Sequence, residues 1–370
     1  MSWSQWHSKS ERLASEAEMA MRRNETSIAD GLYLQAAEAE NQALVALDPS
    51  KTRTLGITAV SAASLWFKGK AFQKAEQLCY LMLSRADLPE FATEQLRNLV
   101  QAIWTEHSKQ SAGVSFLPGQ VYVSVKGGEV VTGGAPLDLI VDKVQAIQSI
   151  FYRTIEESNG MPLRLRGGPV RELQDACRPW IFQAPPGSYQ FSVAIQEPTQ
   201  PDMFKATVDP SSIAERFLAV LRAAVSSDPA QLSLLVPDQG YRSTFLKLAR
   251  NLAPTGKSFE RLEIRSAADN NPLALQPENR KVINATLKSM VSPTLPEVGV
   301  AEVALHGILR AVNLDKDWIE VSVDGISHHI SGLAEALDDV IGPMVNRRVT
   351  VRARRGPAQV YRFDDIELDE

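Results

Sequence analysis

The sequence predicts a multidomain α+β protein with an all-helical N-terminal domain, a central α+β domain and a small C-terminal β-barrel. Three observations lead to this prediction. Apolar residues recur at helical spacing through 1–110, strand and helix patterns mix through 115–292, and five short strand patterns with one helix pattern fill 300–370. We take these three ranges as the domains.

The first domain reads as a series of helical hairpins. Alanines recur at Ala36, Ala37, Ala39, Ala43 and Ala46, and this helix should end at Leu47-Asp48-Pro49. A second pair follows in SAASLWFKGKAFQKAEQLCYLMLSRADLPE, where Gly69 separates the two helices. A third helix should run from Phe91 to Trp104, before a linker from His107 to Gly119.

This pattern resembles the tetratricopeptide helix hairpin. In the second pair, small residues precede Trp66 and Phe67, and Gly69 is followed by A-F-x-x-A. AAEAENQALVALDP is also similar to part of the repeat, whereas Ser64-Leu65 replaces its usual Leu-Gly. The resemblance implies stacked hairpins with a concave surface that holds peptides or partner helices. The alternative is a plain helical bundle that serves as a structural cap.

A partner surface on this domain would use aromatic and basic side chains around the second hairpin. Lysines there would suit an acidic partner, although most aromatics at helical spacing belong to a core. The candidate residues are Trp66, Lys68, Lys70, Lys74 and Tyr80.

The central domain mixes both periodicities. GQVYVSVKGGEVVTGG alternates apolar and polar residues around Gly127-Gly128, which predicts a β-hairpin. The further elements expected are helices at Leu137–Glu157, Ser211–Ser226, Tyr241–Leu252 and Glu278–Val291, and strands at Ser188–Gln196 and Arg261–Arg265. A proline-bearing linker, SPTLPEVG, should end this domain.

The third domain has the element order of an OB-type barrel, namely three strands, a helix and two strands. The strands expected are Val303–Val312, Trp318–Val323, Ile326–Ile330, Arg348–Arg354 and Val360–Leu368, with a helix at Leu333–Ile341. An SH3-like barrel or a partly open sheet is the alternative.

The most distinctive stretch is LRLRGGPVRELQDACRPWIFQAPPGSYQF. Gly167-Gly168-Pro169 before a helix could expose backbone N–H groups to an anion, with Arg164, Arg166 and Arg171 adding positive charge. The structural interpretation treats the glycine turn as a hinge and pairs the arginines with nearby acids such as Glu172. We favour the hinge, because Gly-Gly turns are common.

A second group of arginines lies in RRVTVRARR. Strand geometry places Arg348, Arg352 and Arg354 on one face, where they could follow a phosphate backbone. Residues 300–370 nevertheless carry 8 Lys/Arg and 13 Asp/Glu, a balance of 8 − 13 = −5. We expect the tail DDIELDE to lie beside this strand and to neutralise it.

Signatures of catalysis are absent from the sequence. It has no Walker A, HExxH or GxSxG motif, and adjacent His328 and His329 on a strand would point to opposite faces. Pro237-Asp238 with Glu263-Ile264-Arg265 matches a metal-dependent nuclease only weakly, since arginine cannot supply a proton near neutral pH. We therefore predict no catalytic residue, no metal and no cofactor.

Composition indicates an intracellular protein of ordinary character. The formal net charge of −5 argues against a bulk nucleic-acid coat. Two cysteines, Cys79 and Cys177, form no disulfide framework, the polar N-terminus is unlike a signal peptide, and no apolar run is long enough for a membrane span. We predict a cytoplasmic location without membrane contact.

We therefore expect a non-enzymatic interaction or scaffold protein that grips a protein partner through its helical domain, within a larger complex. The alternative is a nucleic-acid or nucleotide sensor, in a regulatory or defence complex, that uses the arginines of the central domain and barrel. An unrecognised hydrolase in the central domain ranks last.

Overall fold

The computed structural model describes the 370-residue chain except residues 24, 114–115, 117–119, 132, 184–188, 198–211, 267–270, 291–300, 334–337, 357–359 and 370. The chain divides into two compact units, the first built on Met1–Gly113 and the second on the sheet and barrel that follow. We call the first the helical unit. Within the second we distinguish the sheet region, 116–290, from the barrel, 301–369. The predicted linker SPTLPEVG lies outside the described residues.

The helical unit consists of helices in the order that the periodicity predicts. They are α1 (Trp3–Arg22), α2 (Thr26–Ala46), α3 (Thr52–Lys68), α4 (Phe72–Leu83) and α5 (Glu90–Ser111). α2 ends just before Leu47-Asp48-Pro49, and α3 ends at Gly69, as expected. The last helix is longer than predicted, because the polar residues from His107 to Ser111 continue α5 and do not begin a linker.

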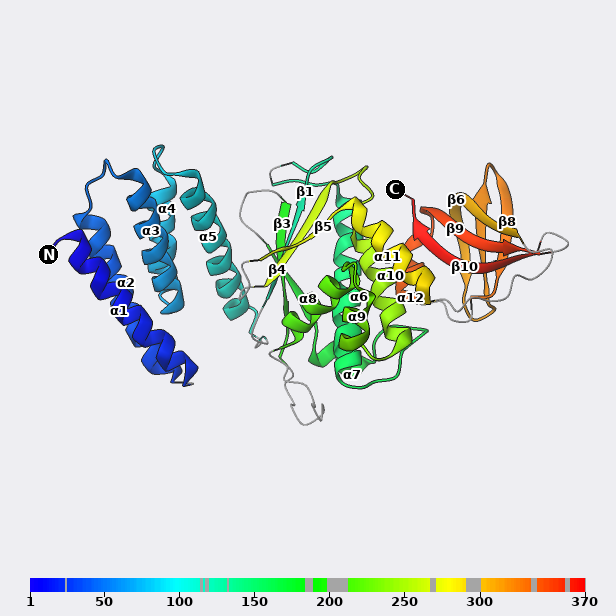
Figure 1. The fold of residues 1–370 in the computed structure, drawn as a ribbon, viewed down its shortest axis with the longest axis horizontal. Helices are drawn as coiled ribbons and strands as arrows, with labels where there is room; N and C mark the ends of the chain where they lie inside the picture. The colour runs from blue at the N-terminus through cyan, green and yellow to red at the C-terminus, as the bar shows by residue number, and fades with distance from the viewer. Residues whose placement is uncertain are drawn as a thin grey trace. The chain divides into compact units, whose positions relative to one another are not determined.

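Small residues let these helices approach one another closely. Each helix packs on the next, and α5 also contacts α3 (Figure 1). A Cβ added at Gly56 would lie 2.9 Å from the Cβ of Ala92, where α3 meets α5. A Cβ at Gly69 would lie 2.9 Å from the Leu34 side chain on α2. Larger residues at either position would therefore push neighbouring helices apart.

The sheet region contains a five-stranded sheet with the order β2-β3-β1-β4-β5. Its strands are β1 (Val121–Lys126), β2 (Pro179–Gln183), β3 (Tyr189–Ile195), β4 (Arg261–Ser266) and β5 (Leu273–Leu275). β1 is the central strand, and it pairs antiparallel with both β3 and β4. The side chains of β1 are almost all buried, as befits a strand with neighbours on both sides.

The hairpin predicted around Gly127-Gly128 is therefore wrong. Both glycines have positive φ, 78° and 63°, and a Cβ at Gly128 would overlap the carbonyl oxygen of Ser258. The amide of Glu129 donates to that same oxygen at 2.9 Å. The glycine turn thus brings the chain against the segment that leads into β4, so β1 takes its partners from distant strands.

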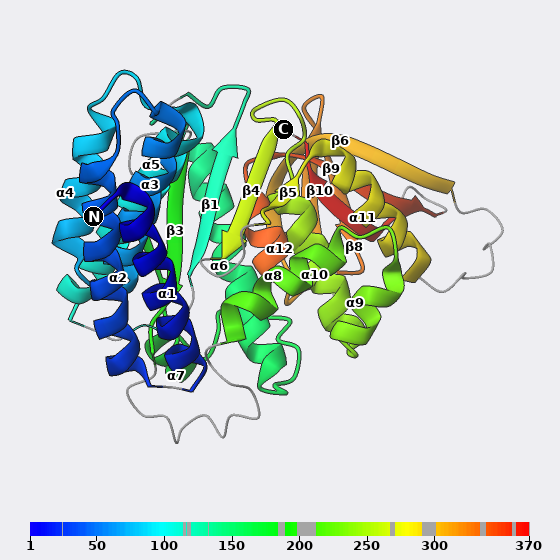
Figure 2. The same ribbon diagram turned by 60° about the vertical axis from the view of Figure 1, so that its left-hand side comes forward.

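Helices pack against the sheet around a core centred on α6 (Figures 1 and 2). They are α6 (Leu137–Ser158), α7 (Arg171–Ala176), α8 (Ile213–Ala224), α9 (Pro229–Leu235), α10 (Gln239–Leu252) and α11 (Pro277–Met290). α6 contacts α8 and α10, and Phe151 of α6 stacks on Phe217 of α8 with ring centroids 4.1 Å apart. Five of these helices lie where they were expected, including the short α7 after Gly167-Gly168-Pro169, whereas α9 and strands β2 and β5 were not predicted.

The C-terminal strands close into a barrel with the order β10-β8-β7-β6-β9. Its elements are β6 (Ala301–Asn313), β7 (Trp318–Val323), β8 (Ile326–Ser331), α12 (Asp338–Ile341), a 3₁₀ turn at Gly342–Met344, β9 (Arg348–Arg355) and β10 (Tyr361–Leu368). β8 and β10 are parallel, and the other pairs are antiparallel. Of the predicted helix Leu333–Ile341, the described part is helical only from Asp338.

The barrel and the sheet region share one hydrophobic core, which includes Ile319 and Val351 of the barrel as well as Ile150 of α6. Their contact therefore combines apolar packing with the ion pairs described below. Among the described helices, none is long and apolar enough to cross a membrane.

Candidate interaction surfaces

The helical unit has an open pocket of about 310 Å³ beside two of its inter-helix turns. It is lined by Met21, Thr26, Asp30, Tyr33, Lys68 and Lys70. These residues come from the end of α1, the start of α2 and the turn between α3 and α4. Two of the five predicted partner-binding residues, Lys68 and Lys70, thus meet in one pocket.

Both lysines of this pocket reach acidic or aromatic neighbours. The Lys68 ammonium lies 5.3 Å from the centroid of the Tyr33 ring and 3.7 Å from Glu18. Lys70 pairs with Asp30 at 2.6 Å, and its side chain is 65% exposed. Burial and then the Glu18 charge raise the pKa of Tyr33 above its usual range, so its hydroxyl stays protonated. The pocket therefore offers an apolar floor with charges at its rim.

The other three predicted residues lie apart from this pocket's lining. Trp66 is only 5% exposed and belongs to the core, and Lys74 covers its ring at 4.2 Å. Tyr80 is 46% exposed on α4, next to Trp104, whose indole N–H donates to Glu76 at 2.6 Å. The sequence analysis did not include Trp104 in the surface, because it used this residue only to mark the end of a helix and did not ask which helix face it occupies.

The arginines of the distinctive stretch do not form one anion site. Arg164 donates to Glu156 at 3.0 Å and pairs with Asp339 of the barrel at 3.2 Å. Arg166 donates to backbone carbonyls of the barrel. Arg171 lies on α7, a helix of six residues, where its side chain is 90% exposed and 3.7 Å from Asp175.

Arg164 is one of several arginines at a seam of ion pairs between the sheet region and the barrel. Arg153 on α6 is fully buried and contacts Asp339 at 2.8 Å. Arg347 of the barrel donates to Asp142 on α6 at 2.8 Å. Burial lowers the pKa of Arg164, but the carboxylates of Asp339 and Glu156 outweigh it and raise the pKa overall, so this arginine keeps its charge.

A further ion pair lies at the same seam, between the fully buried Arg250 on α10 and the half-buried Asp365 on β10, at 2.5 Å. Burial acts to raise the pKa of Asp365, but hydrogen bonds and charge from Arg250 outweigh it, so the pKa falls below its usual value. Asp365 is therefore a carboxylate at neutral pH, and the pair is fully charged.

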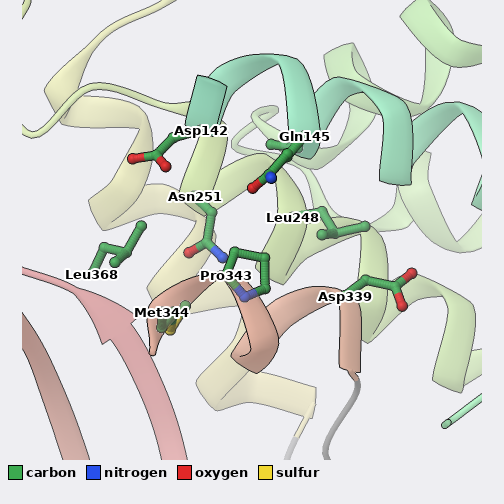
Figure 3. A pocket seen from close by; sticks show the side chains of 9 residues that line it. Asp142, Gln145, Leu248, Asn251, Asp339, Pro343, Met344 and Leu368 are labelled. Carbon is green, nitrogen blue, oxygen red and sulfur yellow. The ribbon is translucent and has the colours of Figure 1, made fainter. Parts of the chain in front are cut away.

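A small cavity of about 20 Å³ lies within the seam (Figure 3). Its lining includes Asp142, Asn251, Asp339 and Met344, contributed by α6, α10 and the barrel. A cavity of this size holds about one water molecule, whereas small-molecule sites occupy some hundreds of Å³. We therefore interpret the seam as a structural junction and not as a substrate site.

Two of the three barrel arginines predicted to follow phosphates are paired within the barrel. Arg352 donates to Glu367 at 2.9 Å, and Arg354 pairs with Asp364 at 2.7 Å. As expected, the acidic last strand β10 lies antiparallel beside β9. Arg348 is exposed at the start of β9.

The barrel carries an aromatic face that sequence reasoning did not assemble. Trp318 on β7 and His329 on β8 have ring centroids 5.0 Å apart. Trp318 lies opposite Ser331, which in turn lies opposite the exposed Arg362 on β10. Trp318, Ser331 and Arg362 thus form a row across three strands. The alternation of residues on these strands is the signal that could have found it.

No constellation typical of catalysis occurs in the part of the chain that the structure describes. In that part, no group of three or more His, Cys, Asp or Glu side chains could hold a metal ion. Asp238 of the weak nuclease match instead accepts from the amide of Tyr241 at the start of α10. Glu263 pairs with Lys126 at 2.6 Å, and Arg265 lies over the Tyr122 ring.

No family model, curated protein or solved structure matches this chain.

Proposed function

We propose that the protein is a non-enzymatic intracellular interaction protein whose helical unit binds a protein partner at the Lys68–Lys70 pocket. The observation that carries this proposal is the pocket itself, which places two half-exposed lysines over an apolar floor. An acidic side chain of the partner could contact the ammonium groups while its apolar part covers Tyr33 and Met21. Charge complementarity of this kind favours an acidic partner over a basic one.

The arrangement of the helices supports a tetratricopeptide-like stack as the scaffold of this surface. α5 contacts both helices of the preceding pair, and Gly56 and Gly69 permit the close approach that such stacking needs. Lys70 has a positive φ of 60° in the turn after Gly69, a conformation that non-glycine residues rarely adopt.

A charge-reversal experiment tests the proposal. The double variant Lys68→Glu/Lys70→Glu should lose a co-purifying partner that the parent chain retains, because two attractive charges become repulsive. Lys51→Glu is the matched control. Lys51 follows the end of α2 and so lies at the opposite end of that helix from Thr26 in the pocket.

The partner band should persist with the control variant and disappear with the double variant, at unchanged helix content by circular dichroism. A partner that binds both variants equally would refute the assignment of this pocket.

A second candidate function is the binding of single-stranded nucleic acid by the barrel. It is favoured by the pair of Trp318 and His329 beside Arg362, which combines a stacking surface with a cation. The strand order, with its parallel β8–β10 pair, supports the OB-type assignment over an SH3-like barrel. Unlike Arg352 and Arg354, this row does not depend on arginines already paired with the acidic tail.

Fluorescence anisotropy with a labelled oligothymidylate tests this second candidate. Trp318→Ala should weaken binding by about 1–3 kcal/mol if one base stacks on the indole. Trp6→Ala, in the helical unit, is the control. If Trp318→Ala and the parent bind with equal affinity, nucleic acid does not bind at the aromatic face of the barrel. Binding that is insensitive to salt would also contradict this candidate function.

A further inference from the structure

We infer that residues 163–168 form an intramolecular clasp through which the sheet region holds two loops at one end of the barrel. The clasp consists of the backbone from Leu163 to Gly168 with the side chains of Arg164 and Arg166. This gives the distinctive arginine–glycine stretch a positioning role in place of an anion-binding role. The contacts that carry the inference join residues about 150 to 175 positions apart in the chain.

Arg166 bridges the two loops directly. Its Nη2 donates to the carbonyl oxygen of Leu314, between β6 and β7, at 3.1 Å. The same nitrogen donates to the carbonyl oxygen of Leu333, just after β8, at 3.3 Å. One guanidinium group thus joins the loop between β6 and β7 to the segment that follows β8. The guanidinium nitrogen carries two N–H groups, one for each carbonyl oxygen.

The barrel also closes these loops on itself. The amide of Gly332 donates to the backbone oxygen of Asp317 at 3.1 Å and lies 3.2 Å from one of its carboxylate oxygens. Asp317 has a positive φ of 64°, so this loop is held in a conformation that non-glycine residues rarely adopt. Arg166 therefore reinforces a loop pair that already carries backbone strain.

The backbone of the clasp contacts the first residue of α12. The amide of Asp338 donates to the Leu165 carbonyl at 3.3 Å, and the amide of Gly167 donates to the Asp338 carboxylate at 2.5 Å. Gly167 has a φ of +75°, which favours glycine. This turn directs the Gly167 amide to the barrel.

Arg164 anchors the clasp to the core of the sheet region. It contacts Glu156 on α6, whose side chain is only 2% exposed, and shares Asp339 with the fully buried Arg153. Buried charges of this kind are little screened by salt, and removing one of them leaves its partner buried without a counter-charge. The position of the barrel loops is therefore set from α6.

The consequence concerns Trp318, which directly follows Asp317, and Ser331, which directly precedes Gly332. The clasped loops adjoin Trp318 on β7 and Ser331 on β8, two of the three strands that carry the row of Trp318, Ser331 and Arg362. This last step rests on the second candidate function. If the row binds single-stranded nucleic acid, Arg166 of the sheet region positions the row for that binding.

Hydrogen exchange measured by NMR on the full chain tests the clasp. Arg166→Gln and Asp338→Ala should speed exchange at the amides of Gly332 and Asp338 by about tenfold, since each removes at least one charge-assisted hydrogen bond. Arg171→Gln is the matched control, because that arginine lies in the same stretch but is 90% exposed. It should leave both rates unchanged.

The pattern of exchange decides the outcome. Acceleration confined to the two loops and α12 supports the clasp. Unchanged rates in both variants would overturn it, and so would acceleration spread equally through β3 and α8, because Arg166 would then merely support the fold.

Oligothymidylate binding by the same variants separates the clasp from the function. If the variants exchange faster in the two loops but bind oligothymidylate as tightly as the parent chain, the clasp does not position the row of Trp318, Ser331 and Arg362. Absence of binding by the parent chain would reject only the second candidate function, and the exchange result on the clasp would stand.

Discussion

Replacing Arg250 by methionine should destabilise the second compact unit severely. Arg250 is fully buried, and its guanidinium contacts Asp365 at 2.5 and 3.0 Å, the Ile366 carbonyl at 2.6 Å and the Asn284 amide oxygen at 2.8 Å. Methionine fills much of the same volume but leaves the Asp365 carboxylate, whose side chain is only 19% exposed, without its main cation. The loss in free energy of unfolding therefore comes from the unpaired Asp365 carboxylate and not from a cavity.

The magnitude follows from the behaviour of buried ion pairs. Removing one partner costs about 3–5 kcal/mol, because the remaining charge stays desolvated. We expect the lower end of this range, since Arg352 lies 3.8 Å from Asp365 and compensates in part. For a unit of this size, 1 kcal/mol corresponds to roughly 2–4 °C in the unfolding midpoint. The midpoint should therefore fall by roughly 6–12 °C.

Thermal unfolding followed by calorimetry measures this effect, because it resolves the transition of the second unit from that of the helical unit. The double variant Arg250→Met/Asp365→Leu should recover most of the stability that Arg250→Met loses, since an apolar pair of similar volume leaves no unpaired charge. Arg171→Met, at an exposed arginine, should change stability by less than about 0.5 kcal/mol. A loss below about 1 kcal/mol for Arg250→Met, or a double variant as unstable as the sum of the single variants, would refute the reasoning.

Further predictions concern a glycine turn, an acidic residue and two thiols. Gly128→Ala should lower the unfolding midpoint more than Gly133→Ala, because both have positive φ but only Gly128 would place its Cβ against a carbonyl oxygen; equal losses would contradict this. The lowered pKa of Asp365 contributes stability above its ordinary 3.8 that is lost as the pH falls through the folded value. Acid titrations of unfolding should therefore show a smaller loss of stability for Asp365→Asn than for the parent in that range, and parallel curves would exclude the linkage. Burial raises the pKa of Cys79 to about 12 and of Cys177 to about 11, so mass spectrometry should find both unmodified by iodoacetamide at pH 8 until denaturant is added. Rapid alkylation of either folded thiol would show that it is accessible.

The two proposed binding surfaces could be predicted only in part from the sequence. Lys68 and Lys70 could be named because they flank the glycine that separates two helices, but their partners in the pocket come from α1 and α2. Trp318 was noted alone, whereas its row depends on the registers that place it opposite Ser331 and that residue opposite Arg362. Arg352 and Arg354 were correctly expected to face acidic neighbours, since their strand and the acidic tail are adjacent in sequence.

Local patterns by themselves determined most helices and the succession of the barrel strands along the chain. α6 and the end of α2 follow from helical spacing and from a proline, which act within a few residues. Short elements such as β5 and α9 carry too few residues for a periodic signal.

Only the tertiary structure decided the neighbours of β1 and the role of the arginine–glycine stretch. The glycine pair after β1 looked like a hairpin turn, but close approach to Ser258 directs the chain elsewhere. Arg164 and Arg166 find their partners on the barrel, more than 140 residues away. Such partners depend on how whole elements pack, and an arginine's charge alone does not distinguish a phosphate from a distant carboxylate or carbonyl of its own chain.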